Sequence, residues 1–525
     1  MLAALKSLLP AVGALQLLLA VTALMLVRYY FKSGFWHQLG VLEVKSWRIL
    51  FFYTQSEYPG YATQEIYTMC REKGQPCAGF YLCTFPTLVA VDLELIRAIV
   101  AKDFSHFMGR GVSFDRENEP MSANLINLEG NEWRSVRHKL TPTFSSGRMR
   151  AMFPLVSACA EEMVAVLRTQ AAPGETVSML DMSARYSIDV IGSCAFGIQA
   201  NALTEPETEF RVMGERAMRF SAIRLLSFFL PPRVSALMRK YLNVTMFDKD
   251  VTRFFNSVFE ENFQFRQQSD VKRHDFVDLL LEIKNNAKLE EGADGKDSTG
   301  LAGNIDDIIQ AQALVFFLAG FETISGTLAN TMTELAHNPD VQDKARAEVQ
   351  RVLAKHGGQI TYEALHDLTY LEQVIEETMR LYPTTSNLPR IATEDYTLPI
   401  PAKNGKPSVI QKGTRVVIPI YAIHRDPEFY TDPDKFNPDN FTAEAKKARP
   451  KYAFLPFGAG PRICIAIRFA MMQLKAALAA VLRDFHLEPM KGSKDYPPRF
   501  RPGTLTTKTY GGNKVLLRPL TDKSA

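Results

Sequence analysis

The stretch Phe457–Ala470, FGAGPRICIAIRFA, places two glycines, a proline and an arginine directly before a cysteine and then continues as an apolar, alanine-rich segment. Gly458 and Gly460 permit backbone angles and close approaches that a side chain would forbid. Cys464 is predicted at the start of the helix that follows, where free N–H groups and the positive end of the helix dipole stabilise a thiolate. Arg462 adds a positive charge two residues earlier. The pattern therefore predicts a site that keeps a sulfur atom anionic.

A thiolate held in this way is a nucleophile, a metal ligand or, in the plainest interpretation, a buried structural cysteine. A nucleophile needs a nearby base, and the nearest histidine in the sequence, His486, lies beyond the predicted helix. One thiolate with one arginine is better suited to a haem iron, with sulfur as the axial ligand and the guanidinium bonded to a propionate. The other cysteines form no C-x-x-C pair and no zinc-type cluster; they are Cys70, Cys77, Cys83, Cys159 and Cys194.

The same loop carries a family resemblance. Phe457, Gly460, Arg462 and Cys464 match the pattern F-x-x-G-x-R-x-C-x-G, and the chain resembles the cytochrome P-450 family over essentially its whole length. Segments such as AGFETIS and LTPTFSSGRM are most similar to insect microsomal members. The resemblance implies haem b as the cofactor and Cys464 as the iron ligand, with Phe457, Gly458, Gly460 and Arg462 around the cofactor. Ala466 stands where the family usually has glycine, and we expect a slight adjustment of the helix against the haem.

Three further residues fall where the family binds the haem propionates. Trp133 and Arg137 lie one turn apart on a predicted helix, and both are pure hydrogen-bond donors that suit a carboxylate. The resemblance assigns this W-x-x-x-R pair to a propionate, and it places Arg390 as another donor. Without the cysteine loop, a tryptophan packed on a surface helix beside an arginine would explain the pair equally well.

Glu377 and Arg380 form an E-x-x-R on a predicted helix. Residues three apart share a helical face and can pair, although isolated pairs of this spacing are common on protein surfaces. The resemblance makes the pair a structural lock beneath the haem, tied in relatives to an arginine. Here Asn440 stands in place of that arginine, so we expect a weaker third member.

Gly320, Glu322 and Thr323 lie near the end of an apolar segment. A glycine inside a helix costs roughly 1 kcal/mol against alanine, so Gly320 calls for a reason, and we expect it to leave room above a haem. A hydroxyl beside a carboxylate can relay protons, and the family's acid–alcohol pair matches Glu322 and Thr323. The alternative is a glycine kink followed by a polar cap. We expect the substrate pocket to include Phe316, Phe317 and Ala319, the loop from Met108 to Met121, and Thr384 to Leu388.

The remaining pattern predicts a mainly α protein with small β-sheets, in which residues 31–525 form a single haem-binding catalytic domain. Residues Ile308–Ala319 are apolar nearly all round, which requires a helix buried on every side. Strand-like runs occur at Phe80–Val91, Tyr396–Ile418 and Lys508–Leu517. The polar stretch Asn285–Gly303 is predicted to be an exposed connection.

The N-terminus predicts a membrane anchor within residues 1–30. Leu8–Val27 is long and apolar enough to cross a bilayer, and the bases Arg28 and Lys32 follow it, which predicts a catalytic domain on the cytosolic side of the endoplasmic reticulum membrane. A cleaved signal peptide is the alternative. The net charge of +4 gives no reason to expect nucleic acid as a partner.

These features together predict a haem-thiolate monooxygenase. The resemblance implies that one oxygen atom of O2 enters a lipophilic small molecule, with electrons from NADPH delivered by a flavoprotein, NADPH-cytochrome reductase, and in some cases by cytochrome b5. Two rivals stay open: a haem-thiolate isomerase or dehydratase that acts on peroxides, and a non-enzymatic membrane haem carrier or sensor.

Overall fold

The computed structural model describes residues 34–44, 58–82, 85–112, 114–172, 174–221, 223–224, 227, 232–242, 244–268, 275–294, 305–490, 496–502 and 506–520. The predicted anchor Leu8–Val27 lies outside these residues. Within them, one helix, Ile305–His337, has the length and apolarity to span a membrane, but 72% of its most apolar window is buried inside the protein. It is therefore the core helix that the all-round apolar pattern predicts.

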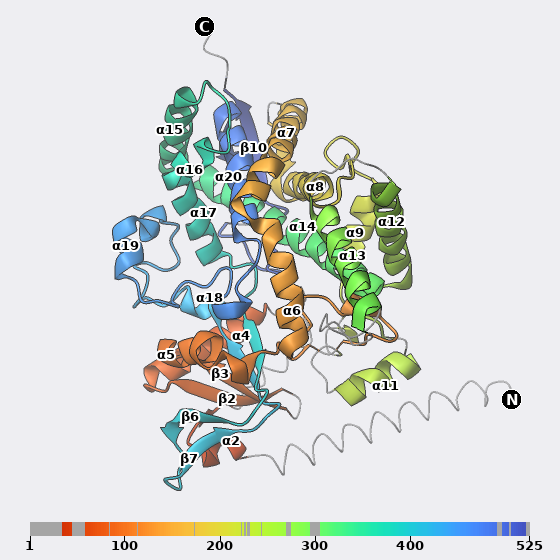
Figure 1. Ribbon diagram of the computed structural model, residues 1–525. Helices are drawn as coiled ribbons and strands as arrows, with labels where there is room; N and C mark the ends of the chain where they lie inside the picture. Colours follow the sequence, from red (N-terminus) through yellow and green to blue (C-terminus); the bar gives the residue numbers. More distant parts are fainter. Residues whose placement is uncertain are drawn as a thin grey trace, which may run out of the picture.

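This core helix, α14 (Ile305–His337), runs through the middle of the molecule (Figure 1). It packs against α8 (Met179–Ile191), α13 (Phe276–Asp294) and α20 (Ile467–Asp484). Since neighbours cover it on all sides, its residues from Ile308 onward are largely buried. The long apolar run thus becomes the axis around which the other helices assemble.

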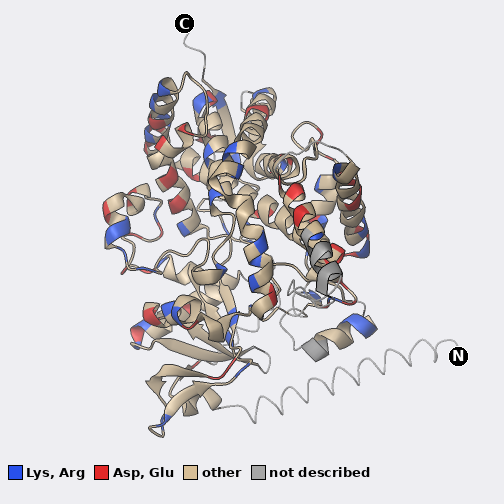
Figure 2. Cartoon of the chain, viewed as in Figure 1, with Lys and Arg blue, Asp and Glu red and all other residues tan. Residues whose placement is uncertain are grey.

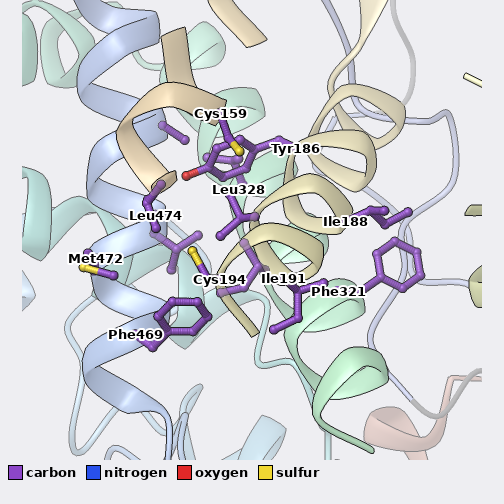
Figure 3. Packing of buried hydrophobic residues seen from close by; sticks show 14 of the residues in the cluster. Cys159, Tyr186, Ile188, Ile191, Cys194, Phe321, Leu328, Phe469, Met472 and Leu474 are labelled. Carbon is purple, nitrogen blue, oxygen red and sulfur yellow. The ribbon is translucent and has the colours of Figure 1, made fainter. Parts of the chain in front are cut away.

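The contact between α8, α14 and α20 forms the centre of the main hydrophobic core (Figure 3). In this view Cys194 lies between Leu328 of α14 and Phe469 of α20, and Ile191 lies between Cys194 and Phe321. Tyr186 is fully buried and its hydroxyl donates to the carbonyl oxygen of Gln473 at 3.0 Å. The close packing fixes how far α20, and with it the cysteine loop, lies from α14.

The remaining helices surround this centre. They are α2 (Phe35–Gln38), α4 (Pro59–Glu72), α5 (Leu93–Arg97), α6 (Gly130–Leu140), α7 (Ser146–Gln170), α9 (Glu209–Ala217), α11 (Pro232–Leu242), α12 (Lys249–Gln268), α15 (Pro339–Lys355), α16 (Ala364–Asp367), α17 (Thr369–Leu381), α18 (Ile420–Ile423) and α19 (Ala443–Ala448). Basic and acidic residues are interspersed along the outer helices (Figure 2).

Three small sheets complete the fold. The largest has the order β1-β2-β3-β8-β5, the second β4-β10-β9, and β6 pairs with β7. The strands are β1 (Leu42–Glu43), β2 (Cys77–Leu82), β3 (Phe85–Ala90), β4 (Thr176–Ser178), β5 (Leu388–Ile391), β6 (Tyr396–Pro401), β7 (Pro407–Ile410), β8 (Arg415–Ile418), β9 (Phe485–Pro489) and β10 (Lys514–Pro519). Antiparallel pairing of β5 with β8 sets Arg390 opposite Val416, so the largest sheet reaches the functional site.

The prediction of a mainly helical protein with small sheets is confirmed. The prediction that Asn285–Gly303 is a connection is wrong for its first part, because α13 continues to Asp294. Residues 285–294 contain alanine, leucine, lysine and glutamate, whose helix propensity outweighs the single glycine at position 292. The rest of that stretch lies outside the described residues.

Candidate active site

The cysteine loop is closed by a backbone hydrogen bond from the Cys464 N–H to the Phe457 carbonyl oxygen at 2.9 Å. Gly458 and Gly460 have positive φ angles of 73° and 69°, which side chains rarely adopt. A Cβ at Gly460 would lie 1.7 Å from the carbonyl oxygen of Val100. Only glycine therefore allows the loop to lie against this neighbouring backbone.

The thiol of Cys464 is exposed toward a cavity and lies just before the first turn of α20. The helix begins at Ile467, three residues later than the sequence predicts, because the Cys464 N–H is already used to close the loop. Burial raises the pKa of the Cys464 thiol, while a bond from the Ala466 N–H and the positive charges of Arg137 and Arg110 favour the thiolate. Burial has the larger effect, so the pKa of the thiol stands above its ordinary value, and the backbone bond and the two charges only lessen that rise.

Arg462 lines the cavity, and its side-chain hydrogen bonds go to backbone carbonyl oxygens. Its side chain is buried and donates to the carbonyl oxygens of Met108 at 3.0 Å and Leu128 at 2.6 Å. The guanidinium carbon also lies 4.2 Å from the ring centroid of Trp133. Arg462 therefore joins the cysteine loop to the segment before α6, and its charge is not among those that favour the Cys464 thiolate.

Arg110, Arg137 and Arg462 line the cavity, and Arg390 lies near enough to Arg110 for the two charges to repel each other. Burial and the charges of Arg110 and Arg390 lower the pKa of Arg462 to about 8. Burial and Arg110 lower the pKa of Arg390 to about 9. Arg137 is repelled by the same group and donates to the carbonyl oxygen of Ile463 at 2.7 Å. A cluster of this kind requires an anionic ligand, because buried charges are stable only when they are paired.

The hydrogen-bonding inventory supports the same conclusion. The Nε and Nη2 atoms of Arg390 and the Nε atom of Arg110 are buried without a hydrogen-bond partner. The sequence did not predict Arg110 as a charged residue of this site. The sequence feature that could have identified Arg110 is its position between Gly109 and Gly111, whose small size allows the chain to turn toward the cavity.

A cavity of about 310 Å³ connects these groups, and its walls are mainly apolar. The cysteine loop lies on one side and α14 on the other. Of the predicted site residues, the structure brings Trp133, Arg137, Gly320, Thr323, Phe457, Gly458, Arg462 and Cys464 to this cavity. Its lining also includes Phe316, Ala319, Thr384 and Leu388 from the predicted substrate pocket, whereas Phe317 packs instead against Phe210 and Phe255.

Gly320 lines the cavity, yet its lack of a side chain also serves helix packing. A Cβ at this position would lie 2.8 Å from Cδ1 of Ile191 in α8. The glycine therefore allows α8 and α14 to approach closely, which the prediction of free space above a haem did not include.

Thr323 and Glu322 are adjacent in sequence but have different surroundings. Thr323 faces the cavity and its hydroxyl donates to the Ala319 carbonyl oxygen at 2.7 Å. Glu322 is 5% exposed and forms an ion pair with Lys508 through Oε1, while its Oε2 is buried without a partner. Burial raises the pKa of Glu322, and Lys508 opposes the rise. The carboxyl thus has one oxygen in an ion pair and one buried oxygen without a hydrogen-bond partner, and Glu322 is not among the residues that line the cavity.

Glu377 and Arg380 of α17 form a fully buried pair. The Arg380 Nε and Nη2 atoms both donate at 2.7 Å to the two carboxylate oxygens of Glu377. The remaining guanidinium bonds go to the carbonyl oxygens of His424, Pro433 and Lys435 at 3.0, 2.6 and 2.9 Å. The amide Nδ2 of Asn440 donates to Glu377 Oε1 at 3.2 Å.

Comparison with known proteins agrees with this site. The family model of Cytochrome P450 matches residues 45–513. "Probable cytochrome P450 6a23" of Drosophila melanogaster is 38% identical over 489 residues, which cover 90% of this chain and 93% of the relative. "Cytochrome P450 6a2" of the same species is 36% identical over 522 residues, covering 95% and 98%. "Cytochrome P450 6a8", also of that species, is 40% identical over 428 residues, covering 80% and 82%.

The fold and the comparisons together define a haem-thiolate monooxygenase. The chain belongs to the cytochrome P450 family and is similar to its insect 6a members. Its own residues fit the cofactor that the family implies. One accessible thiol faces a mainly apolar cavity, and guanidinium atoms of Arg110 and Arg390 are buried without partners, which is the kind of donor that the haem carboxylates would accept. A redox partner is part of the family's chemistry.

Proposed function

We propose that Cys464 is the iron ligand of haem b, and that Trp133, Arg137, Arg390 and Arg462 form its propionate site with Arg110. The observation that carries this proposal is the group of arginines in which burial, together with the charge of Arg110, lowers the pKa of Arg462 and Arg390, and in which guanidinium atoms of Arg390 and Arg110 are buried without partners. Two carboxylates would neutralise most of this charge. Phe457, Gly458 and Gly460 shape the loop that presents the sulfur.

When bound, the haem supplies the activation of O2, and the thiolate ligand favours O–O cleavage. The chain's own residues bind and orient the substrate and deliver protons to the cavity. Apolar lining residues exclude water and hold a neutral lipophilic substrate. Thr323 presents its hydroxyl to the cavity, and Glu322 is the acid that resupplies its proton. Gly320 sets the distance of this segment from α8.

The protein receives its electrons from NADPH through NADPH-cytochrome reductase in our proposal, with cytochrome b5 as an additional donor. Residues 1–30 anchor the chain in the endoplasmic reticulum membrane, and residues 31–525 form the catalytic domain on the cytosolic side. The apolar run Leu8–Val27 followed by Arg28 and Lys32 supports this placement, as does the microsomal character of the insect relatives.

Reconstitution in phospholipid vesicles with NADPH-cytochrome reductase tests the proposal. Uncharged alkoxycoumarins serve as lipophilic probes, and the release of product, the consumption of NADPH and the formation of hydrogen peroxide are measured together. We expect product formation that requires NADPH. Thr323→Ala should still consume NADPH but divert it to hydrogen peroxide, because the hydroxyl that hands on the proton is gone.

The two rival functions give different outcomes in the same assay. Turnover with an organic hydroperoxide but none with NADPH and reductase would identify an isomerase or dehydratase. A protein that retains haem, oxidises no probe in either assay and is indifferent to Thr323→Ala would be a carrier or sensor.

A further inference from the structure

We propose that Arg449 is a positioning residue that ties the buried Glu377–Arg380 pair to the segment entering the cysteine loop, an inference that rests on the proposed haem site. Arg449 follows α19 and lies on the chain that leads to Phe457. It is only partly exposed, and no carboxylate forms an ion pair with it among the described residues. Its surroundings explain why a cation is kept there.

The guanidinium of Arg449 is held in an aromatic cage. Its central carbon lies 4.5 Å from the ring centroids of both Tyr430 and Phe441 and 6.0 Å from that of Phe454. Its Nη2 atom donates to the carbonyl oxygen of Asn440. A cation over several aromatic faces is a favourable arrangement when it is shielded from water, so the cage fixes Arg449 against three separate segments.

Two neighbours of Arg449, the ring of Tyr430 and Asn440, also contact the buried ion pair. The ring of Tyr430 has the Arg380 guanidinium 5.0 Å from its centroid, so one ring is shared by two arginines. The backbone carbonyl oxygen of Asn440 accepts a hydrogen bond from Arg449, and its side-chain Nδ2 donates one to Glu377. Arg449 therefore holds the neutral amide in the position from which it reaches the carboxylate.

Phe454, another ring of the cage, leads directly into the cysteine loop. Phe454 precedes Leu455, whose N–H donates to Nε2 of His424 at 2.8 Å and whose carbonyl oxygen accepts from the Gly458 N–H at 3.0 Å. Burial and the charges of Arg380 and its neighbours lower the pKa of His424 to about 3, which keeps Nε2 available as an acceptor. A shift of Phe454 would consequently move the backbone that presents Gly458.

The test uses purified holoprotein reduced chemically with dithionite and treated with carbon monoxide. A thiolate-ligated haem gives a strongly red-shifted Soret band, and the measured quantity is the rate at which this band converts to an ordinary one under mild heating. Arg449→Met removes the charge, Arg449→Lys keeps the charge without the planar fork, and Lys447→Met on the exposed end of α19 is the matched control. Far-UV circular dichroism and the thermal midpoint report on the overall fold.

We expect Arg449→Met to convert roughly fivefold faster or more, the scale set by losing a buried cation–aromatic contact. Arg449→Lys should lie between Arg449→Met and the wild type, and Lys447→Met should equal the wild type. Equal conversion rates for Arg449→Met and Lys447→Met would overturn the inference. So would a difference that disappears when each variant is compared at the same distance below its own thermal midpoint, because that result describes general destabilisation only.

Arg449→Lys keeps the experiment decisive if Arg449→Met yields no holoprotein, since a wild-type rate in Arg449→Lys would then contradict a role for the caged guanidinium. A wild-type protein that never shows the red-shifted band would instead refute the proposed haem site itself. The two failures are therefore distinguishable.

Discussion

Two buried glutamates, Glu377 in α17 and Glu322 in α14, show how similar burial can lead to different roles. Glu377 is fully buried, and both of its oxygens accept hydrogen bonds from Arg380. Glu322 is 5% exposed, but only Oε1 has a partner, the ammonium of Lys508. Burial raises the pKa of both carboxyls.

This difference in hydrogen bonding indicates which of the two carboxylates can take part in proton transfer. The Glu377–Arg380 pair has no spare acceptor or donor in its geometry, so any change of partner would leave a buried charge unpaired. Glu322 retains an unused acceptor and pairs with a lysine that is 34% exposed to solvent. A carboxylate with both oxygens bonded acts as structure, whereas Glu322, which has an unused oxygen and precedes the cavity-lining Thr323, can change its proton or partner.

The largest effect is expected from breaking the saturated pair. Glu377→Gln should destabilise the protein by on the order of 3–5 kcal/mol, because Arg380 would remain buried without a counter-charge. The yield of haem-loaded protein and the thermal midpoint measure this loss. Glu94→Gln on α5 removes an exposed pair of the same spacing with Arg97 and should leave the thermal midpoint close to that of the wild type.

Equal stability for these two variants would mean that burial does not distinguish the pairs. The claim that the buried Glu377–Arg380 pair stabilises the protein more than an exposed pair would then be wrong.

A smaller effect, on kcat, is expected when Glu322 is replaced. Glu322→Gln should lower kcat by about tenfold or more, the scale of a lost proton donor. Lys508→Met should have a weaker effect and should move the alkaline limb of the kcat–pH profile to higher pH, because Glu322 acts in its protonated form and Lys508 opposes the rise in its pKa. Lys514→Met on the exposed part of β10 provides a control in the same C-terminal region.

The pH profiles of Lys508→Met and Lys514→Met are the discriminating result. If the two curves superimpose, Lys508 does not set the proton affinity of Glu322, and the ion pair is only a surface contact of the C-terminal segment.

The smallest effect is expected from a third glutamate, Glu334, near the end of α14. Burial raises its pKa to about 7, although the hydroxyls of Tyr382 and Tyr496 donate to its oxygens at 2.5 and 3.0 Å. The folded protein therefore binds a proton that the unfolded chain releases above its ordinary pKa of 4.5. This contribution to stability is complete below that value and declines as pH rises to about 7.

Glu334→Gln should flatten the decline, because the amide stays neutral at every pH. The thermal midpoint of wild type and variant, followed from about pH 4.5 to pH 7, measures the difference. A decline of the same size in both proteins would assign the pH dependence to other groups.

The sequence alone predicts those parts of the fold that depend on local pattern. The apolar run Ile308–Ala319 indicates a buried helix, and the glycines before Cys464 indicate a tight loop, since both depend on residues close together in the chain. The contribution of Arg110 could not be predicted in this way, because its meaning depends on three arginines from distant segments. Likewise, the pairing of Glu322 with Lys508 joins residues that only the folded chain brings together.

The role of Arg462 shows the same limit at shorter range. Its position two residues before Cys464 indicates a charge beside the sulfur, but its side chain extends to the carbonyl oxygens of Met108 and Leu128. Sequence spacing fixes where a Cα lies in a loop, whereas the direction of a long side chain depends on which tertiary partners surround it.

The central claim is that the Cys464 sulfur is the axial ligand of a haem iron. The most direct measurement is the optical spectrum of the dithionite-reduced, carbon monoxide-treated protein, recorded for wild type and for Cys464→Ser at equal haem content. We expect a strongly red-shifted Soret band in the wild type and its absence in Cys464→Ser. A Cys464→Ser protein that keeps the red-shifted band and full turnover would contradict the account.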